Sequence, residues 1–175
     1  MGVTTASFEP CPGCGALFLS SDGPTHRYIG ASAGCWAAHG RLLAGEYPHS
    51  LGKLTATVVD AYAAQHPGQD VAPARQSVAI HLVVLHARIH HDVDSAWLNR
   101  IRVVSAEWGH ANGFEWLEPI PDWRLTMSDV IEANGATARD AVVDQWIQHV
   151  YEAWMDGQGA RVRVWYDRII ESLHR

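Results

Sequence analysis

Apolar residues recur at intervals of three and four along most of the chain, which is the spacing of amphipathic helices. The clearest example lies over residues 75–92, where Val78, Leu82, Leu85 and Ile89 share one face of a helical wheel. The same spacing predicts further helices over residues 33–47, 51–65, 95–104, 138–156 and 160–173. The pattern therefore predicts a mainly α protein, a helical bundle of five or six helices.

Capping residues and prolines indicate where these helices begin and end. Side chains that can cap an N-terminus mark the start of three of these helices and of one short turn: Ser32, Ser95 and Thr137 for the helices, and Ser128 for the turn. Pro67 disfavours helical geometry in the residue before it, so the second helix is expected to stop near His66. Residues 109–127 contain two prolines and are expected to form a loop, followed by a short turn that ends at Gly135.

Residues 8–30 contain seven prolines and glycines and carry no helical pattern. The short apolar run Ala16–Leu19 favours a strand, so we expect a compact zinc-knuckle-like loop or hairpin here. The length of 175 residues favours a single domain over 1–175, with a knuckle segment at 8–30 and a helical body at 31–175.

Composition and charge narrow the classes of function. No apolar run approaches the length of a membrane span, and the N-terminus lacks the layout of a signal peptide, so we expect a cytoplasmic protein that does not bind membranes. The net charge is −6, and the deficit lies in residues 92–175, which hold eight basic and fourteen acidic side chains. An acidic domain is a poor match for nucleic acid, so a small-molecule ligand is the partner to consider. The oligomeric state stays open.

The most specific motif is Cys11-Pro12-Gly13-Cys14-Gly15. Two thiolates at this spacing can hold one tetrahedral ion, and the glycines let backbone amides turn toward the sulfurs. The rival interpretation is a thioredoxin-like redox pair, which needs a helix that starts at the cysteines. Gly15 and the strand-like run after it argue against such a helix, so we expect a Zn²⁺ knuckle.

A tetrahedral zinc needs two more ligands. Cys35 is the one remaining thiol and the first choice. The candidates for the fourth position are water, an acidic side chain and four histidines: His66 at a helix end, His39 one turn after Cys35, His26 in a nearby loop and His81 beside an apolar stripe. Four protein ligands would make the site structural, whereas three ligands and water would leave a position for catalysis. The residues alone leave both possibilities open.

Two other features carry candidate chemistry. His86 and His90 have the spacing of a helical metal chelate, although a polar helix face is the default interpretation. Eight tryptophans are many for this length, and Trp146 and Trp154 share a helix face with Val150, which indicates core packing. An aromatic-lined pocket for a small ligand is the alternative.

With these residues in view, the chain resembles an uncharacterised bacterial family of small proteins, a domain of unknown function. The resemblance rests on five segments: Cys11–Gly15, Asp22–Tyr28, Ala31–Trp36, Asp60–Gly68 and Gln76–Leu82. The resemblance implies that His26, His66 and His81 are stronger candidates for functional residues. It implies that His39 is a weaker one, because the family more usually carries an aromatic residue there. Relatives carry a His pair where this chain has Gln158 and Gly159, which implies that a role of that pair is lost or altered here.

Three hypotheses follow. The first is a zinc-binding protein in which Cys11, Cys14, Cys35 and a His, foremost His66, link the knuckle to the helices. The second is a metal-dependent enzyme that acts on a small molecule, with an open metal site near His66 and a pocket of candidate catalytic residues: Asp60, Tyr62, Gln76 and His81. The third is a thiol redox or partner-binding adaptor that uses the Cys11–Cys14 pair.

Overall fold

The computed structural model describes residues 7–50, 52, 55–91 and 93–174. In chain order its elements are β1 (Phe8–Pro10), β2 (Leu17–Leu19), α1 (Ala33–Leu43), α2 (Thr55–Gln65), α3 (Ala72–His90), α4 (Ser95–Asn112), α5 (Met127–Glu132) and α6 (Ala136–Leu173). The two strands pair antiparallel, with Glu9 opposite Phe18. The prediction of a mainly α fold with an N-terminal hairpin is confirmed.

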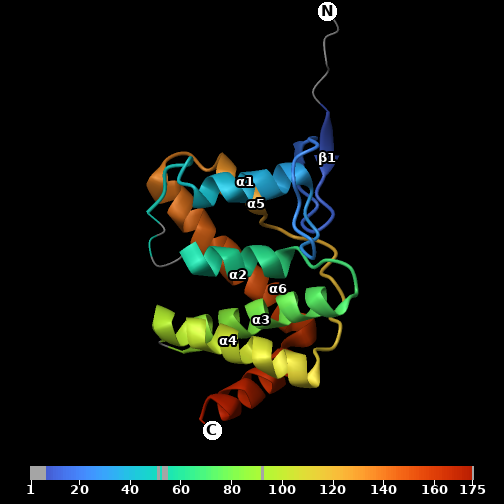
Figure 1. Ribbon diagram of the computed structural model, residues 1–175. Helices are drawn as coiled ribbons and strands as arrows, with labels where there is room; N and C mark the ends of the chain where they lie inside the picture. Colours follow the sequence, from blue (N-terminus) through green and yellow to red (C-terminus); the bar gives the residue numbers. More distant parts are fainter. Residues whose placement is uncertain (1–6, 51, 53–54, 92, 175) are drawn as a thin grey trace, which may run out of the picture.

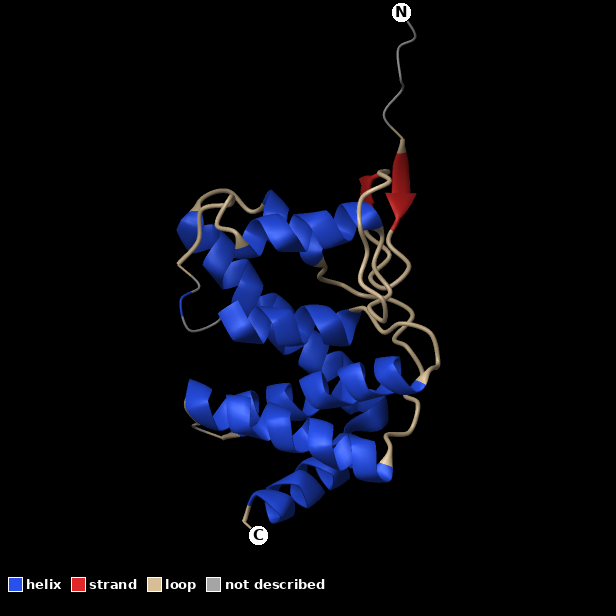
Figure 2. Cartoon of the chain, in the orientation of Figure 1, coloured by secondary structure: helices blue, strands red, loops and turns tan. Residues whose placement is uncertain are grey.

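Helices α1 to α4 lie one below another, and the long α6 crosses behind them (Figure 1). Helix α3 packs against α2, α4 and α6, which places it at the centre of the bundle. The hairpin and the longer loops gather on one side of the helices, beside the end of α2 (Figure 2). The knuckle segment is thus folded against the helical body.

Tryptophans on α6 anchor it to α2. Trp146 and Trp154 are both fully buried, as the spacing on this helix predicted. Their indole N–H groups donate to Gln65 Oε1 and to the Ala64 carbonyl, each at 3.0 Å. Each ring therefore buries a large apolar surface while its polar atom stays paired.

The prediction of separate helices over 138–156 and 160–173 is wrong, because α6 is continuous from Ala136 to Leu173. Gly157 and Gly159 lie inside it, although each glycine disfavours a helix interior by about 1 kcal/mol relative to alanine. Trp154, Val162 and Trp165 are buried on both sides of the glycines. Burial of that face outweighs the local helix preference.

Replacement of Gly157 with alanine is expected to raise the free energy of unfolding by about 0.5–1 kcal/mol. Gly157 is exposed, and a Cβ added there meets no atom within 4 Å, so the gain is the lower entropy of the unfolded chain. Urea denaturation measures the difference. In the control, Gly45→Ala, φ is +78°, so alanine should destabilise. An unchanged midpoint for Gly157→Ala would contradict a continuous α6.

Several predicted helix ends differ from the observed ones. Ser32 caps α1 as expected, but Asp94 rather than Ser95 caps α4, because its carboxylate accepts a hydrogen bond from the Trp97 amide at 2.8 Å. Thr126 rather than Ser128 begins α5, through a reciprocal capping box with Asp129.

The remaining differences are in helix length. Gly135, not Thr137, precedes α6. Helix α1 ends at Leu43 rather than 47, just before the positive φ of Gly45, and α4 continues to Asn112, before Gly113. Leu51 and Leu54, which were expected in the second helix, lie outside the described residues.

Candidate metal centre

Three thiols and one imidazole meet where the hairpin contacts the helices. Cys11 and Cys14 come from the loop between β1 and β2, Cys35 from the first turn of α1, and His66 from the residue after α2. Their ligand atoms all lie within 4.8 Å of one another. All four residues are at most 4% exposed, and none of the cysteines is in a disulfide. The cluster could hold a metal ion.

The hairpin loop turns the two cysteines to the same side. The Cys11 amide donates to the Ala16 carbonyl and the Gly15 amide donates to the Cys11 carbonyl, each at 2.8 Å. Gly15 has a φ of +75°, which favours glycine. No helix starts at this pair in the described residues, in contrast to a thioredoxin-like site.

The N-cap of α1 ties Cys35 to the loop. Ser32 Oγ accepts a hydrogen bond from the Cys35 amide at 3.3 Å, which fixes Cys35 in the first helical turn. The Ser32 amide itself points at the Cys11 sulfur, 3.4 Å away. One capping residue therefore positions one candidate ligand and donates to the sulfur of another, as expected around bound thiolates.

His66 is held in one orientation by the end of α2. Its Nδ1 lies 2.7 Å from the Tyr62 carbonyl, which can only accept, so Nδ1 carries the proton. Nε2 then presents its lone pair to the cluster, 3.3 Å from the Cys35 sulfur. The Tyr62 hydroxyl donates to the same sulfur at 3.4 Å. The hydrogen bond from His66 Nδ1 to the Tyr62 carbonyl is of the kind that orients a metal-binding histidine.

Glycines let the loops approach His66 closely. A Cβ added at Gly13 would lie 2.6 Å from both the Gly30 carbonyl oxygen and His66 Cδ2. The Gly30 amide donates to the His66 carbonyl at 2.9 Å, and Ile29 forms an isolated bridge with Pro67. Two loops thus enclose the histidine, which accounts for Gly13 in the cysteine motif and for Gly30 before α1.

Without a cation, the arrangement of the three thiols favours ionisation of one of them, Cys11. Hydrogen bonds from Cys14 and Cys35 lower the pKa of the Cys11 thiol far below its ordinary value. Their own hydrogen bonds to Cys11 and their burial raise the pKa of Cys14 to about 12 and that of Cys35 still further. Complete ionisation of three adjacent buried thiols therefore requires a cation among them.

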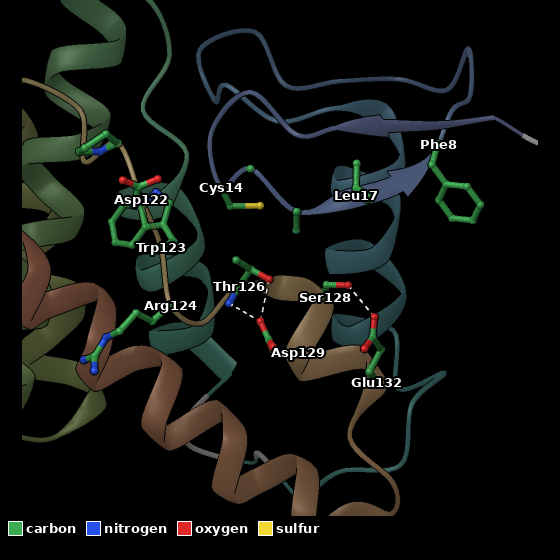
Figure 3. Close-up of a pocket in the computed structure, with 13 residues that line it drawn as sticks. Phe8, Cys14, Leu17, Asp122, Trp123, Arg124, Thr126, Ser128, Asp129 and Glu132 are labelled. Carbon is green, nitrogen blue, oxygen red and sulfur yellow. Dashed lines mark hydrogen bonds between the residues drawn. The ribbon is translucent and has the colours of Figure 1, made fainter.

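Neighbouring residues shield the cluster from solvent. The Trp123 indole N–H donates to the Gly13 carbonyl at 3.0 Å and holds the knuckle from the other side. A cavity of about 830 Å³ lies between the hairpin and α5, with Leu17 and Glu132 on its walls (Figure 3). Cys14 reaches its edge, but only 4% of this residue is exposed. The described residues thus shield all four candidate ligand atoms.

His39 and His26, two of the other candidates for the fourth position, lie outside the cluster. The His39 ring stacks on Tyr62 at 3.9 Å between centroids, and its buried Nε2 has no hydrogen-bond partner among the described residues. His26 packs against Tyr28 and Trp36. Both histidines make aromatic contacts beside the cluster rather than complete it.

His39 is expected to make the protein sensitive to acid. Burial, with a smaller contribution from nearby His66, lowers the pKa of His39 from 6.5 to about 4. Between these two pH values the unfolded chain binds the proton more readily than the folded protein does. The free energy of unfolding therefore keeps its full value above pH 6.5 and falls as the pH drops toward 4.

Replacement of His39 with phenylalanine keeps the contact with Tyr62 and removes an unpaired buried nitrogen. We expect an unfolding free energy higher by about 1–3 kcal/mol, with a margin over wild type that grows as the pH falls. Urea unfolding of both proteins from pH 7 to 4 measures it. A difference in unfolding free energy between the two proteins that stays the same at every pH would contradict this role of His39.

Of the four candidate catalytic residues, Tyr62 belongs to the sulfur cluster, whereas the other three lie together elsewhere. His81 Nδ1 is 2.8 Å from Asp60 Oδ1, and Gln76 lines the same cavity as His81. Arg102 on α4 pairs with both oxygens of Asp60. Sequence reasoning missed Arg102, because no local pattern links a residue 42 positions away to Asp60.

His86 and His90 share a hydroxyl. Tyr151 Oη lies 2.7 Å from His86 Nδ1 and 2.8 Å from His90 Nε2. Because a phenol can donate to one nitrogen and accept from the other, the pair is satisfied within the protein. This geometry favours the polar-face interpretation over a helical metal chelate.

Comparison with known proteins gives a family and no function. No helix in the described residues is long and apolar enough to cross a membrane. No curated protein and no solved structure matches the chain. The family model of a family of unknown function, DUF5946, matches residues 9–155, a span that contains all four residues of the cluster. The chain belongs to this family.

Proposed function

We propose that this protein binds one Zn²⁺ ion through Cys11, Cys14, Cys35 and His66, and that the ion joins the knuckle to the helices. The observation that carries the proposal is the convergence of four buried ligand atoms within 4.8 Å of one another. Ideal tetrahedral zinc holds sulfurs about 3.8 Å apart, so only a small contraction is needed. Three thiolates and one imidazole are a donor set that zinc prefers.

The donor set favours a structural site over a catalytic one. Four protein ligands complete a tetrahedral sphere, whereas catalytic zinc keeps a position for water. Burial of the four residues supports the same assignment. The ion would connect the hairpin loop to the start of α1 and the end of α2, segments that are far apart in the sequence.

A thiol redox role is the second candidate, and the lowered pKa of Cys11 is the observation in its favour. Thiol exchange needs access to the sulfur, and Cys11 is only 1% exposed. In a reducing compartment such as the cytoplasm, the thiols stay available to a metal. Burial therefore gives zinc binding the stronger support.

The test is metal analysis of the purified full-length protein, with Cys11→Ser as the comparison. We expect one equivalent of zinc in the wild type, and an X-ray absorption spectrum that fits three sulfurs and one nitrogen. Cys11→Ser should bind far less. Less than about half an equivalent, unchanged by this substitution, would overturn the proposal. A nitrogen-free or water-containing coordination shell would overturn its closed, structural form.

A further inference from the structure

A second group of polar side chains surrounds a cavity on the exposed side of α3. The cavity has a volume of about 590 Å³. Its walls come from the first turns of α3, from the loop before α1 and from the end of α4: Tyr28, Ala72, Pro73, Gln76, Ser77, Ile80, His81 and His110. None of these residues belongs to the cysteine cluster.

A buried ion pair fixes the orientation of His81. Asp60, only 1% exposed, accepts a hydrogen bond from His81 Nδ1 at 2.8 Å and also pairs with the Arg102 guanidinium. Since a carboxylate held by arginine can only accept, the proton of neutral His81 lies on Nδ1. The lone pair on Nε2 is then left for the cavity that His81 lines.

The free polar groups around the cavity match a ligand without charge. Within the described part of the chain, no protein hydrogen bond engages His81 Nε2 or the side chains of Gln76 and Ser77. The described residues of its walls include no Asp, Glu, Lys or Arg, and their apolar part includes Pro73 and Ile80. A ligand with a carbonyl group and an apolar body suits such walls.

We propose that this cavity is a catalytic site for small uncharged carboxylic esters, in which His81 acts as general base. His81 Nε2 takes a proton from water as the water oxygen bonds to the acyl carbon. The ester C–O bond then breaks, and the same proton passes to the leaving oxygen, which gives one carboxylic acid and one alcohol. The Gln76 carboxamide and the Ser77 hydroxyl supply donors for the carbonyl oxygen. Asp60 and Arg102 are positioning residues that hold the imidazole tautomer.

The competing explanation is that Asp60 only ties α2, α3 and α4 together. The Asp60–Arg102 pair would suffice for that task. It gives no reason for a third partner, His81, that lines a cavity together with Gln76 and Ser77, whose side chains have no hydrogen bond to the described residues. Activity and tautomer state separate the two explanations.

The test uses 4-nitrophenyl acetate with the full-length, metal-loaded protein. We expect saturable hydrolysis that falls at least about 100-fold in kcat/KM for His81→Gln. His174→Gln, which removes an exposed imidazole at the other end of the chain, controls for hydrolysis by surface histidines. Ile80→Trp fills the cavity, leaves Asp60, His81 and Arg102 unchanged in sequence, and should abolish saturation, with thermal melting as the check on folding.

A second measurement keeps the proposal testable if hydrolysis is weak. Nitrogen NMR shifts of the His81 ring should show a proton on Nδ1 and none on Nε2, and Asp60→Asn should lose this preference. Unchanged hydrolysis in His81→Gln, a rate that rises linearly with ester in the wild type, or a proton on His81 Nε2 would each overturn the proposal.

Discussion

Replacement of Cys35 with serine is expected to lower the zinc content to near zero and the free energy of unfolding by several kcal/mol. Structural zinc contributes about 10–16 kcal/mol to the folding of isolated zinc-finger peptides. The loss is smaller here because the helical body has its own core, which includes Trp146, Trp154 and Leu82. Metal analysis and urea unfolding measure the two effects.

Ala37→Ser is the matched control, since it places the same hydroxyl on an exposed position of the same helix. It should keep the metal and change stability by no more than about 0.5 kcal/mol. A chelator should bring the wild type to the stability of Cys35→Ser and leave that variant unchanged. If Cys35→Ser retains one equivalent of zinc, Cys35 is not a ligand.

Replacement of Trp154 with alanine is expected to cost about 3–5 kcal/mol of stability. Trp154 is fully buried between α6 and α2, and its loss leaves both a cavity and an unpaired Ala64 carbonyl. Urea unfolding at neutral pH with bound zinc measures the change. Because Trp154 supplies no atom of the cluster, the zinc content of the folded variant should stay at one equivalent.

Two further variants divide this cost. Trp154→Phe keeps most of the ring and loses the hydrogen bond, so it should cost about 0.5–1.5 kcal/mol plus a smaller cavity term. Val164→Ala removes an exposed side chain from the same helix and should stay within about 0.5 kcal/mol of wild type. A loss below about 1 kcal/mol for Trp154→Ala would mean that α6 does not anchor the bundle through this residue.

The sequence predicted the features that depend on neighbouring residues. The glycines around Cys11 and Cys14 predicted a turn, and the run that ends at Leu19 predicted the second strand of the hairpin. Ser32 and Pro67 predicted a helix start and a helix end, and both are observed. Turn chemistry and capping act within a few residues, so a single sequence records them.

Predictions failed where long-range burial outweighed a local preference. The apolar pattern predicts two helices, over 138–156 and 160–173, yet the buried face of α6 continues past Gly157 and Gly159 between them. The cap of α4 is a separate case, in which no burial is involved. The sequence predicts Ser95, although Asp94, one residue earlier, competes for the same role. Neighbouring capping residues differ too little in energy for a pattern to separate them.

The residue types and their spacing determined which side chains could bind a metal, namely three thiols and several histidines. They also determined a helical body large enough to form its own core. Tertiary structure alone decided which histidine meets the thiols, because His26, His39 and His66 all had suitable local settings. It also separated His81 from the cluster and paired it with Asp60, whose carboxylate pairs with Arg102 as well. A contact across 31 or 42 residues depends on how helices pack, and packing is a property of the whole core rather than of any segment.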